Sequence, residues 1–195
     1  MARSGHTSMR LSVAFTASLA ILSTPPGADA FKPPPAARAA AEARLDRLSD
    51  AWAALSGTDL AGARLTPARF AGRVVVVDFW ATWCAHCLAE IPWLRRIRDD
   101  FGTDRVAVVG VNLDVSDRRT LVAWLNRQRL DWPQLHDGRG YAGAVARAFD
   151  VTSLPTLVVV DAQGRVVATD LRGERLYAAV EQLVSARPGA SASLR

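Results

Sequence analysis

Cysteine is scarce in this sequence, because the chain of 195 residues has only two, Cys84 and Cys87. Any disulfide within the chain must join these two residues, and a framework of structural disulfides is excluded. Histidine is also rare, with three residues in all. A structural zinc site needs four ligands, and His86 lies between the two cysteines, where it is poorly placed to share a metal with both. We therefore expect no metal site.

Blocks of like charge and internal repeats are also missing. The formal net charge of +5 comes mostly from arginines scattered along the chain. A nucleic-acid-binding arm would need a block of Lys and Arg, so we expect a solvated basic surface and no nucleic-acid partner. Half of the residues are hydrophobic and 22% are charged, which suits one domain of ordinary size with terminal extensions.

The first 30 residues have the pattern of an export signal. Arg3 and Arg10 precede the apolar stretch 11–23, which is too short for an ordinary transmembrane helix. Pro and Gly at 25–27 break it, and residues 28–30 (Ala-Asp-Ala) place small side chains where a signal peptidase reads. We expect this segment to be a signal peptide that directs the protein to the periplasm or cell envelope. An uncleaved membrane anchor is the alternative.

The rest of the chain divides by pattern into a spacer, a helix and an alternating region. Residues 31–58 predict a Pro-rich spacer and an amphipathic helix, whose stripe of Leu45, Leu48, Trp52 and Leu55 should pack on the main domain. From residue 59 to 185 strands and helices alternate, which predicts an α/β sandwich with a mixed sheet. The residues from 186 to 195 predict a disordered tail. The expected elements are strands at 74–80, 105–111, 132–135, 156–160 and 165–169, and helices at 84–101, 117–129, 141–149 and 173–184.

The stretch from Val74 to Cys87 carries the chemistry. Four valines predict a buried strand, and the residues after Cys87 are mostly good helix formers, so Cys84 stands where a strand leads into a helix. A helix N-terminus carries partial positive charge and free N–H groups, and both favour a thiolate over a thiol. Two cysteines placed there can open and close a disulfide.

Two segments resemble a known family. Residues 78–87 (Asp-Phe-Trp-Ala-Thr-Trp-Cys-Ala-His-Cys) resemble the active-site segment of thioredoxin-fold proteins, and residues 153–156 (Ser-Leu-Pro-Thr) resemble their cis-proline loop. The string from Trp80 to Pro92 is most similar to exported TlpA/ResA-like thiol-disulfide oxidoreductases. The resemblance implies a thioredoxin-like sandwich, with a mixed central sheet flanked by helices, an insertion before the cis-proline loop and an extra N-terminal helix. It also implies an enzyme that exchanges disulfides with proteins and needs no organic cofactor.

The resemblance also implies roles for five residues. Cys84 would be the attacking and more exposed thiol, and Cys87, almost one turn deeper, would resolve the mixed disulfide. Asp78 would lie buried beneath the disulfide, where a raised pKa fits it to take the proton of Cys87. Glu90, one helical turn after Cys87, could face back towards that thiol. Pro155 would be the cis-proline, and the backbone before it would pair with an extended substrate.

His86 departs from this resemblance. It stands before the second cysteine, where TlpA/ResA-like reductases usually have proline and where DsbA and protein disulfide isomerase have histidine. An imidazole near Cys84 would stabilise the thiolate and so make the disulfide a stronger oxidant. The full string therefore favours a reductase with a membrane electron donor, and cytochrome c maturation is a candidate process. His86 favours a DsbA-like or isomerase-like function instead.

Two other functions share parts of the pattern. Peroxiredoxin-like thiol peroxidases place Thr three residues before the reactive cysteine and Pro further upstream, whereas Ala81 and Val77 hold those positions here. A copper-delivery protein would bind metal through both cysteines, with His136 as the one further ligand candidate, but such proteins usually space their cysteines more widely. We expect a monomer that acts on dithiols and disulfides of other proteins.

Overall fold

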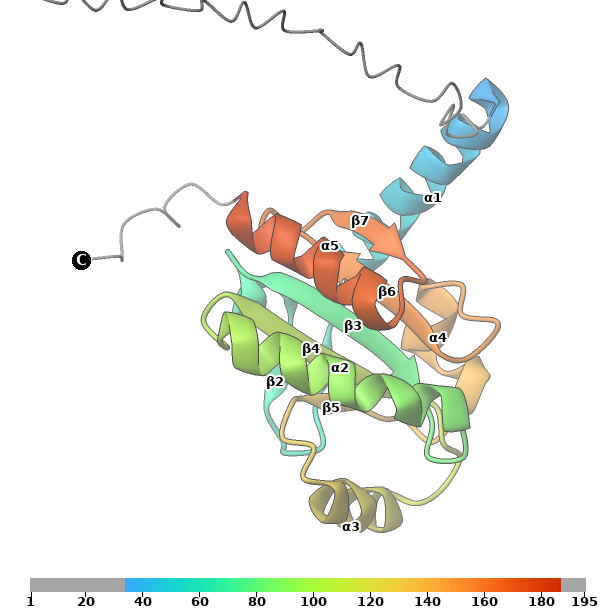
Figure 1. The fold of residues 1–195 in the computed structure, drawn as a ribbon. Coiled ribbons are helices and arrows are strands. Elements are labelled where there is room, and N and C mark those ends of the chain that lie inside the picture. Colours follow the sequence, from blue (N-terminus) through green and yellow to red (C-terminus); the bar gives the residue numbers. More distant parts are fainter. Residues whose placement is uncertain (1–33, 187–195) are drawn as a thin grey trace, which may run out of the picture. The chain divides into compact units, whose positions relative to one another are not determined.

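The computed structural model describes residues 34–186, whose main element is a five-stranded mixed sheet in the order β5-β4-β3-β6-β7 (Figure 1). Central strand β3 (Val74–Trp80) runs parallel to β4 (Val106–Asn112) and antiparallel to β6 (Thr156–Val160). Strand β7 (Val166–Thr169) pairs antiparallel with β6, and the short edge strand β5 (Gln134–Leu135) is parallel to β4. The predicted signal peptide and the tail from residue 187 lie outside the described residues.

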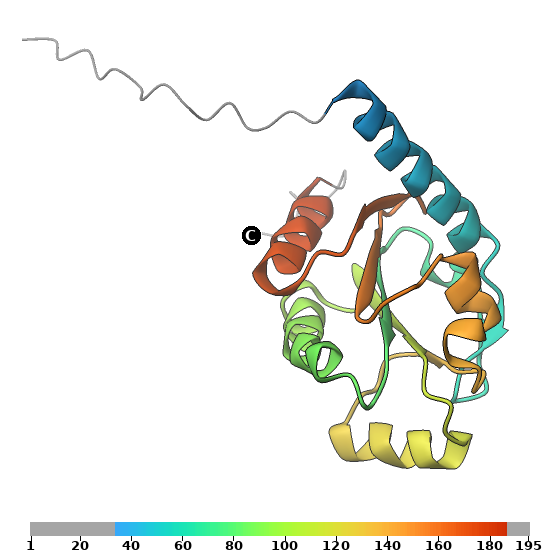
Figure 2. The same cartoon turned by 90° about the vertical axis from the view of Figure 1, so that its right-hand side faces the viewer.

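One face of the sheet is covered by helices α2 (Ala85–Phe101) and α5 (Gly173–Ser185), which pack against each other. Figure 2 shows these two helices on one side of the sheet. Side chains alternate along a strand, and Val74, Val76 and Trp80 of β3 belong to the core beneath these helices. Asp78 falls in the same alternating series. Its carboxyl therefore points into the layer between β3 and α2.

The opposite face is covered by α1 (Pro35–Ala53), the 3-10 turn η1 (Pro67–Phe70) and α4 (Ala144–Ala148) (Figure 2). Leu48, Trp52 and the following Leu55 are buried in this second core, so the stripe of the N-terminal helix packs on its own domain as predicted. The hydroxyl of Ser49 accepts a hydrogen bond from the backbone N–H of Val166 at 2.9 Å and joins α1 to β7.

The spacer expected over 31–36, before a helix over 37–55, is too long, because α1 already begins at Pro35. Proline is compatible with the first position of a helix, since the N–H it lacks would have no partner there. The sequence reading also missed a small hairpin of β1 (Gly57–Thr58) and β2 (Arg64–Leu65), whose strands are only two residues long.

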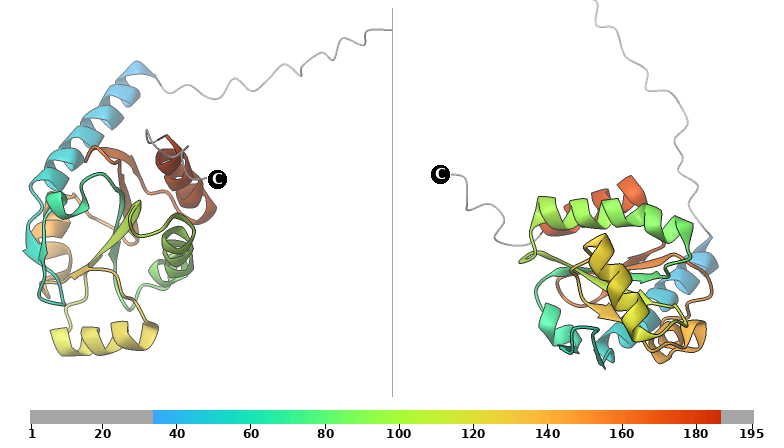
Figure 3. Two further views of the ribbon diagram at one scale, coloured as in Figure 1. Left: turned by 90° about the vertical axis from the view of Figure 1, so that its left-hand side faces the viewer. Right: turned by 90° about the horizontal axis from the view of Figure 1, so that it is seen from below.

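Between β4 and the cis-proline loop the chain forms α3 (Arg118–Gln128), β5, the 3-10 turn η2 (Gly140–Ala142) and α4. Helix α3 belongs to the segment before the cis-proline loop, where the insertion was expected, and it lies at the β5 side of the sheet (Figure 3). Asp117 caps it by accepting hydrogen bonds from the N–H groups of Arg119 and Thr120.

The single helix predicted over 141–149 is wrong. Gly143 takes an extended conformation (φ −62°, ψ 148°) and separates η2 from α4. A side chain at this position would begin 2.6 Å from the carboxylate of Asp137, which explains why glycine stands there. Within residues 34–186 no helix has the length and hydrophobicity needed to cross a membrane.

Candidate active site

The two cysteines form a disulfide at the end of β3, with an S–S distance of 2.09 Å. Cys84 is the N-cap residue of α2, and its sulfur accepts a hydrogen bond from the backbone N–H of Cys87 at 3.1 Å. After reduction the same N–H and the helix N-terminus would stabilise a thiolate on Cys84. Cys84 is 7% exposed and Cys87 is 1% exposed, so the predicted order of exposure is confirmed.

Asp78 lies buried on the α2 side of β3, with 2% of its surface exposed. Burial, reinforced by the negative charge of Glu90 and opposed by the positive charge of Arg172, raises the pKa of Asp78 to about 8. The raised pKa agrees with the prediction from the sequence. One carboxylate oxygen, Oδ1, has no hydrogen-bond partner within residues 34–186. An acid of this kind can gain or lose a proton near neutral pH.

Glu90 also faces the interior, with 8% of its surface exposed, on the buried stripe of α2 that includes Cys87 and Ile91. Its Oε2 accepts a hydrogen bond from the backbone N–H of Gly173 at 2.9 Å. Gly173 is the first residue of α5, so the carboxylate lies at a helix N-terminus, where negative charge is favourable. Glu90 thus joins the two helices that cover the site. Its role in moving a proton stays a prediction.

Arg172 is a member of this site that the sequence did not reveal. Its Nη2 donates a hydrogen bond to the carbonyl oxygen of Pro155, and its charge acts on Asp78. Its Nη1 is buried and has no partner in the described part of the chain. The chain has 24 Lys and Arg residues, and no motif separates Arg172 from the others. In the sequence, Arg172 is distinguished only by its position just before the last helix.

The peptide bond between Leu154 and Pro155 is cis, as predicted. Strand β6 begins at Thr156, which is the register partner of Phe79 near the end of β3. This pairing brings the cis-proline loop to the end of the strand that leads to Cys84. The hydroxyl of Thr156 donates a hydrogen bond to the carbonyl of Ser153 at 2.9 Å and closes the loop.

The side chains around the motif divide between surface and core. His86 is exposed on the first turn of α2. Trp83 is 63% exposed, whereas Trp80 is buried and its Nε1 donates a hydrogen bond to Oε1 of Gln134 at 2.9 Å. The exposed indole of Trp83 gives the surface beside Cys84 an apolar character.

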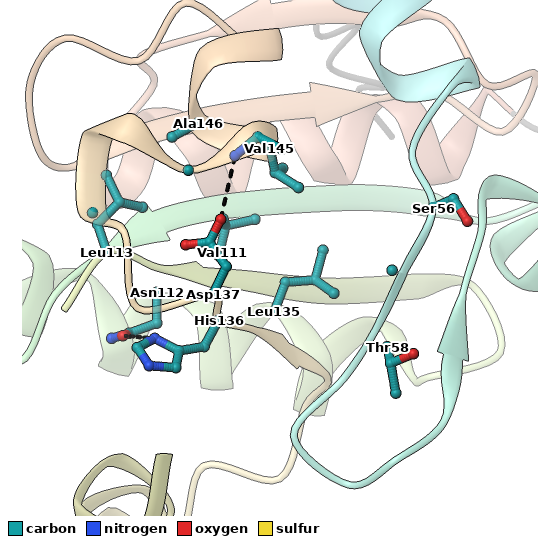
Figure 4. A pocket seen from close by; sticks show the side chains of 14 residues that line it. Ser56, Thr58, Val111, Asn112, Leu113, Leu135, His136, Asp137, Val145 and Ala146 are labelled. Carbon is teal, nitrogen blue, oxygen red and sulfur yellow. Dashed lines mark hydrogen bonds between the residues drawn. The ribbon is translucent and has the colours of Figure 1, made fainter. Parts of the chain in front are cut away.

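A hydrogen-bonded chain holds the loop before Cys84. The carboxylate of Asp114 accepts bonds from the N–H and the hydroxyl of Thr82 at 3.1–3.2 Å. Asn112 donates to Asp114 at 2.9 Å, and its Oδ1 lies 3.1 Å from Nδ1 of His136 (Figure 4). Nε2 of His136 lies 3.1 Å from the carbonyl oxygen of Ser116. Both ring nitrogens of His136, the copper-ligand candidate, therefore have protein partners.

A cavity of about 220 Å³ lies beside this chain, lined mainly by apolar side chains of β4, β5 and α4 (Figure 4). Neither cysteine lines it, and it is smaller than the usual range of small-molecule sites. Within residues 34–186 no group of three or more His, Cys, Asp or Glu side chains gathers as a metal site would require.

Comparison with known proteins decides the family. A family model described as the AhpC/TSA family matches residues 48–169, which include both cysteines and the cis-proline. The chain belongs to this family. Thiol-disulfide oxidoreductase ResA of Bacillus thuringiensis subsp. konkukian (strain 97-27) is 26% identical over 125 residues, which cover 64% of this chain and 69% of that protein. Thioredoxin-like protein YneN of Bacillus subtilis (strain 168) is 30% identical over 95 residues, which cover 48% of this chain and 53% of that protein.

The solved structures agree with these relatives. The thioredoxin domain of a thiol-disulfide oxidoreductase from Bacteroides vulgatus superposes with a TM-score of 0.60 at 28% identity, and the match covers 67% of this chain and 92% of that one. The resemblance to TlpA/ResA-like proteins and the thioredoxin-like fold are thereby confirmed. With its Cys84–Cys87 disulfide, the chain is a thiol-disulfide oxidoreductase that acts on protein thiols.

Proposed function

We propose that this protein is an exported reductase that breaks disulfides in other exported proteins and regains its electrons from a membrane donor. The observation that carries the reducing direction is the pair of buried carboxyls, Asp78 on β3 and Glu90 on α2, the strand and the helix that meet at the Cys84–Cys87 disulfide. Export is supported by the signal-like pattern of the first 30 residues.

The reaction uses the two thiols of the reduced protein. The Cys84 thiolate attacks a sulfur of the partner's disulfide, so that a mixed disulfide forms and one partner thiolate leaves. Cys87 then loses its proton to Asp78 and attacks the sulfur of Cys84. The intramolecular disulfide forms, the second partner thiolate leaves, and solvent supplies protons to both partner thiolates. Two electrons have passed from the cysteine pair to the partner.

The direction depends on which charges stabilise the thiolates. Buried negative charge near the cysteines disfavours their thiolate forms, which makes the disulfide the more stable state and the couple more reducing. Glu90 acts from the interior, where electrostatic effects are strong, and Asp78 adds its negative charge as the pH rises towards its pKa of about 8. His86 would act in the opposite sense, but it is exposed, so solvent and salt screen its charge. The interior carboxyls therefore outweigh the imidazole.

The reduction potential of the Cys84–Cys87 couple, measured against glutathione, tests this direction. We expect a value near that of reducing proteins such as thioredoxin, at about −270 mV. A value near that of DsbA, about −120 mV, would show that the protein is an oxidase and that His86 dominates. Glu90→Gln should raise the potential, since it removes negative charge, whereas Asp78→Asn should raise it only above about pH 8, where the carboxyl of Asp78 is ionised.

The partner can be found by trapping. Cys87→Ser keeps the attacking thiol and removes the resolving one, so mixed disulfides with physiological partners should accumulate. Cys84→Ser is the matched control and should trap none. We propose that the trapped proteins include envelope proteins with a disulfide to be reduced, with apocytochrome c as one candidate. Recovery of cytoplasmic proteins alone, from cells lysed after quenching of thiols, would contradict export.

A further inference from the structure

We propose that Arg172 is a positioning residue for disulfide exchange, which links the buried Asp78–Glu90 pair to the cis-proline loop and favours the ionised form of Asp78, the form that can accept the proton of Cys87. This inference rests on the proposed function, because it concerns the step in which Cys87 resolves the mixed disulfide. Arg172 itself touches neither sulfur in the structure and acts through Asp78 and Pro155.

Arg172 is tied to two parts of the site, because its guanidinium bonds the cis-proline loop and its chain neighbour Gly173 donates its backbone N–H to Glu90. One arm, Nη2, donates to the carbonyl oxygen of Pro155, in the loop that is expected to bind substrate backbone. The other arm, Nη1, is buried without a partner within residues 34–186, and so is the acceptor Oδ1 of Asp78. A buried donor and a buried acceptor that remain unpaired are costly, and a role for both groups in the exchange reaction would account for them.

The charges around Asp78 come from few elements. The register partner of Asp78 on β4 is Gly110 and its partner on β6 is Leu157, and neither of these residues can ionise. Helix α2 contributes Glu90, besides the cysteines, and the residue before α5 is Arg172. Glu90 and Arg172 are the charged side chains of the described residues that act appreciably on Asp78, in opposite directions.

Removing the positive charge leaves burial and Glu90 unopposed. The pKa of Asp78 would then rise above its value of about 8, and the ionised fraction of the carboxyl at neutral pH, already the smaller one, would fall further. Fewer molecules could then take the proton of Cys87, so the second step would slow while attack by Cys84 continued. The guanidinium also fixes the Pro155 carbonyl, so its loss should weaken binding of a protein substrate.

Two substitutions separate charge from anchoring. Arg172→Gln keeps a donor for Pro155 and removes the charge, whereas Arg172→Lys keeps the charge but replaces the planar fork by a single ammonium. Arg175→Gln is the matched control, because Arg175 lies exposed on the first turn of α5 and its loss removes the same charge. All variants are made in the full chain, and their folding is checked by circular dichroism.

Stopped-flow kinetics of the reduced proteins with insulin, from pH 5.5 to 9.5, resolve the two steps. We expect Arg172→Gln to move the pH midpoint of the resolving step upward by about one unit and to slow that step about tenfold at pH 7. Attack by Cys84 should keep its wild-type rate. Arg172→Lys should keep the wild-type midpoint and raise the KM for insulin, and Arg175→Gln should change neither.

A wild-type pH profile in folded Arg172→Gln would overturn the proposal. If that variant does not fold, Arg172→Lys provides the test. An unchanged KM would contradict the assigned contact with Pro155, and a shifted midpoint would contradict the assigned action of the charge on Asp78. Failure of the proposed function looks different. In that case the wild-type protein itself would have an oxidising potential or would not reduce insulin, whatever residue stands at 172.

Discussion

Replacing Asp78 by Asn should stabilise the oxidised protein, and the gain should depend on pH. The pKa of Asp78 is about 8 in the folded protein and 3.8 in the unfolded chain, where the carboxyl is solvated. Between these two values the folded state holds a proton that the unfolded state has released. The free energy of unfolding therefore falls as the pH rises from about 4 to about 8. Asparagine has nearly the same shape and never ionises.

The magnitude follows from the distance between pH 7 and the unfolded pKa of 3.8. At 1.36 kcal/mol per unit, this distance of about three units corresponds to roughly 4 kcal/mol of lost stability in the wild type. Local rearrangement around the carboxyl reduces the amount, so we expect Asp78→Asn to gain about 2–4 kcal/mol at pH 7. The gain should shrink towards pH 4 and vanish below about pH 3, where both states of the wild type are protonated.

Urea unfolding of the oxidised proteins at pH 4.5, 7 and 8.5 measures this difference. Each comparison is made at one pH, so the titration of other groups cancels between variant and wild type. Asp46→Asn is the control, because Asp46 is exposed on α1, and it should give the same stability as wild type at every pH. A gain for Asp78→Asn that is equal at pH 4.5 and 8.5 would refute the linkage argument, since it would show that the carboxyl is not protonated by folding.

Three further outcomes test the site. Cys84→Ser should abolish reduction of insulin, and if this variant rather than Cys87→Ser traps mixed disulfides, the roles of the two thiols are reversed. His86→Pro should lower the reduction potential by tens of millivolts and raise the pKa of the Cys84 thiol, followed by thiolate absorbance, and an unchanged potential would mean that solvent screens the imidazole completely. Glu90→Gln should slow the resolving step while attack by Cys84 keeps its rate, and equal rates for the second step would remove Glu90 from the mechanism.

The parts of the fold that the sequence predicted well are those where local pattern and burial agree. Strands β3 and β4 are buried on both faces, so they read as continuous β-branched runs, and both were placed within one residue. The errors lie where tertiary contacts override pattern. Gly143 is extended and divides η2 from α4, while the carboxylate of Asp137, distant from the helix pattern, accepts a hydrogen bond from the N–H of Ala144, the first residue of α4.

The residues of the candidate site also divide into those that a local pattern predicts and those that only tertiary contacts bring together. The two cysteines and Pro155 belong to local motifs, and the burial of Asp78 follows from the alternation along β3. The partner of Glu90 is Gly173, which lies 83 positions away in the sequence. Arg172 meets Pro155 only after the chain has formed the β6–β7 hairpin. Contacts between residues so far apart leave no periodicity or spacing in the sequence, so they could not be predicted from one sequence.

The inserted segment before the cis-proline loop also takes part in shaping the site, through Gln134 of edge strand β5. Its Oε1 accepts a hydrogen bond from Trp80, and the amide covers Gly110, the register partner of Asp78. A Cβ at position 110 would stand 2.0 Å from this Oε1, which forces Gln134 to move. Any side chain at Gly110 would thus displace the amide and leave the buried indole N–H of Trp80 unpaired, at a cost of about 1–3 kcal/mol. The insertion and the glycine therefore have to be kept together for Trp80, and with it the start of the active-site loop, to stay in place.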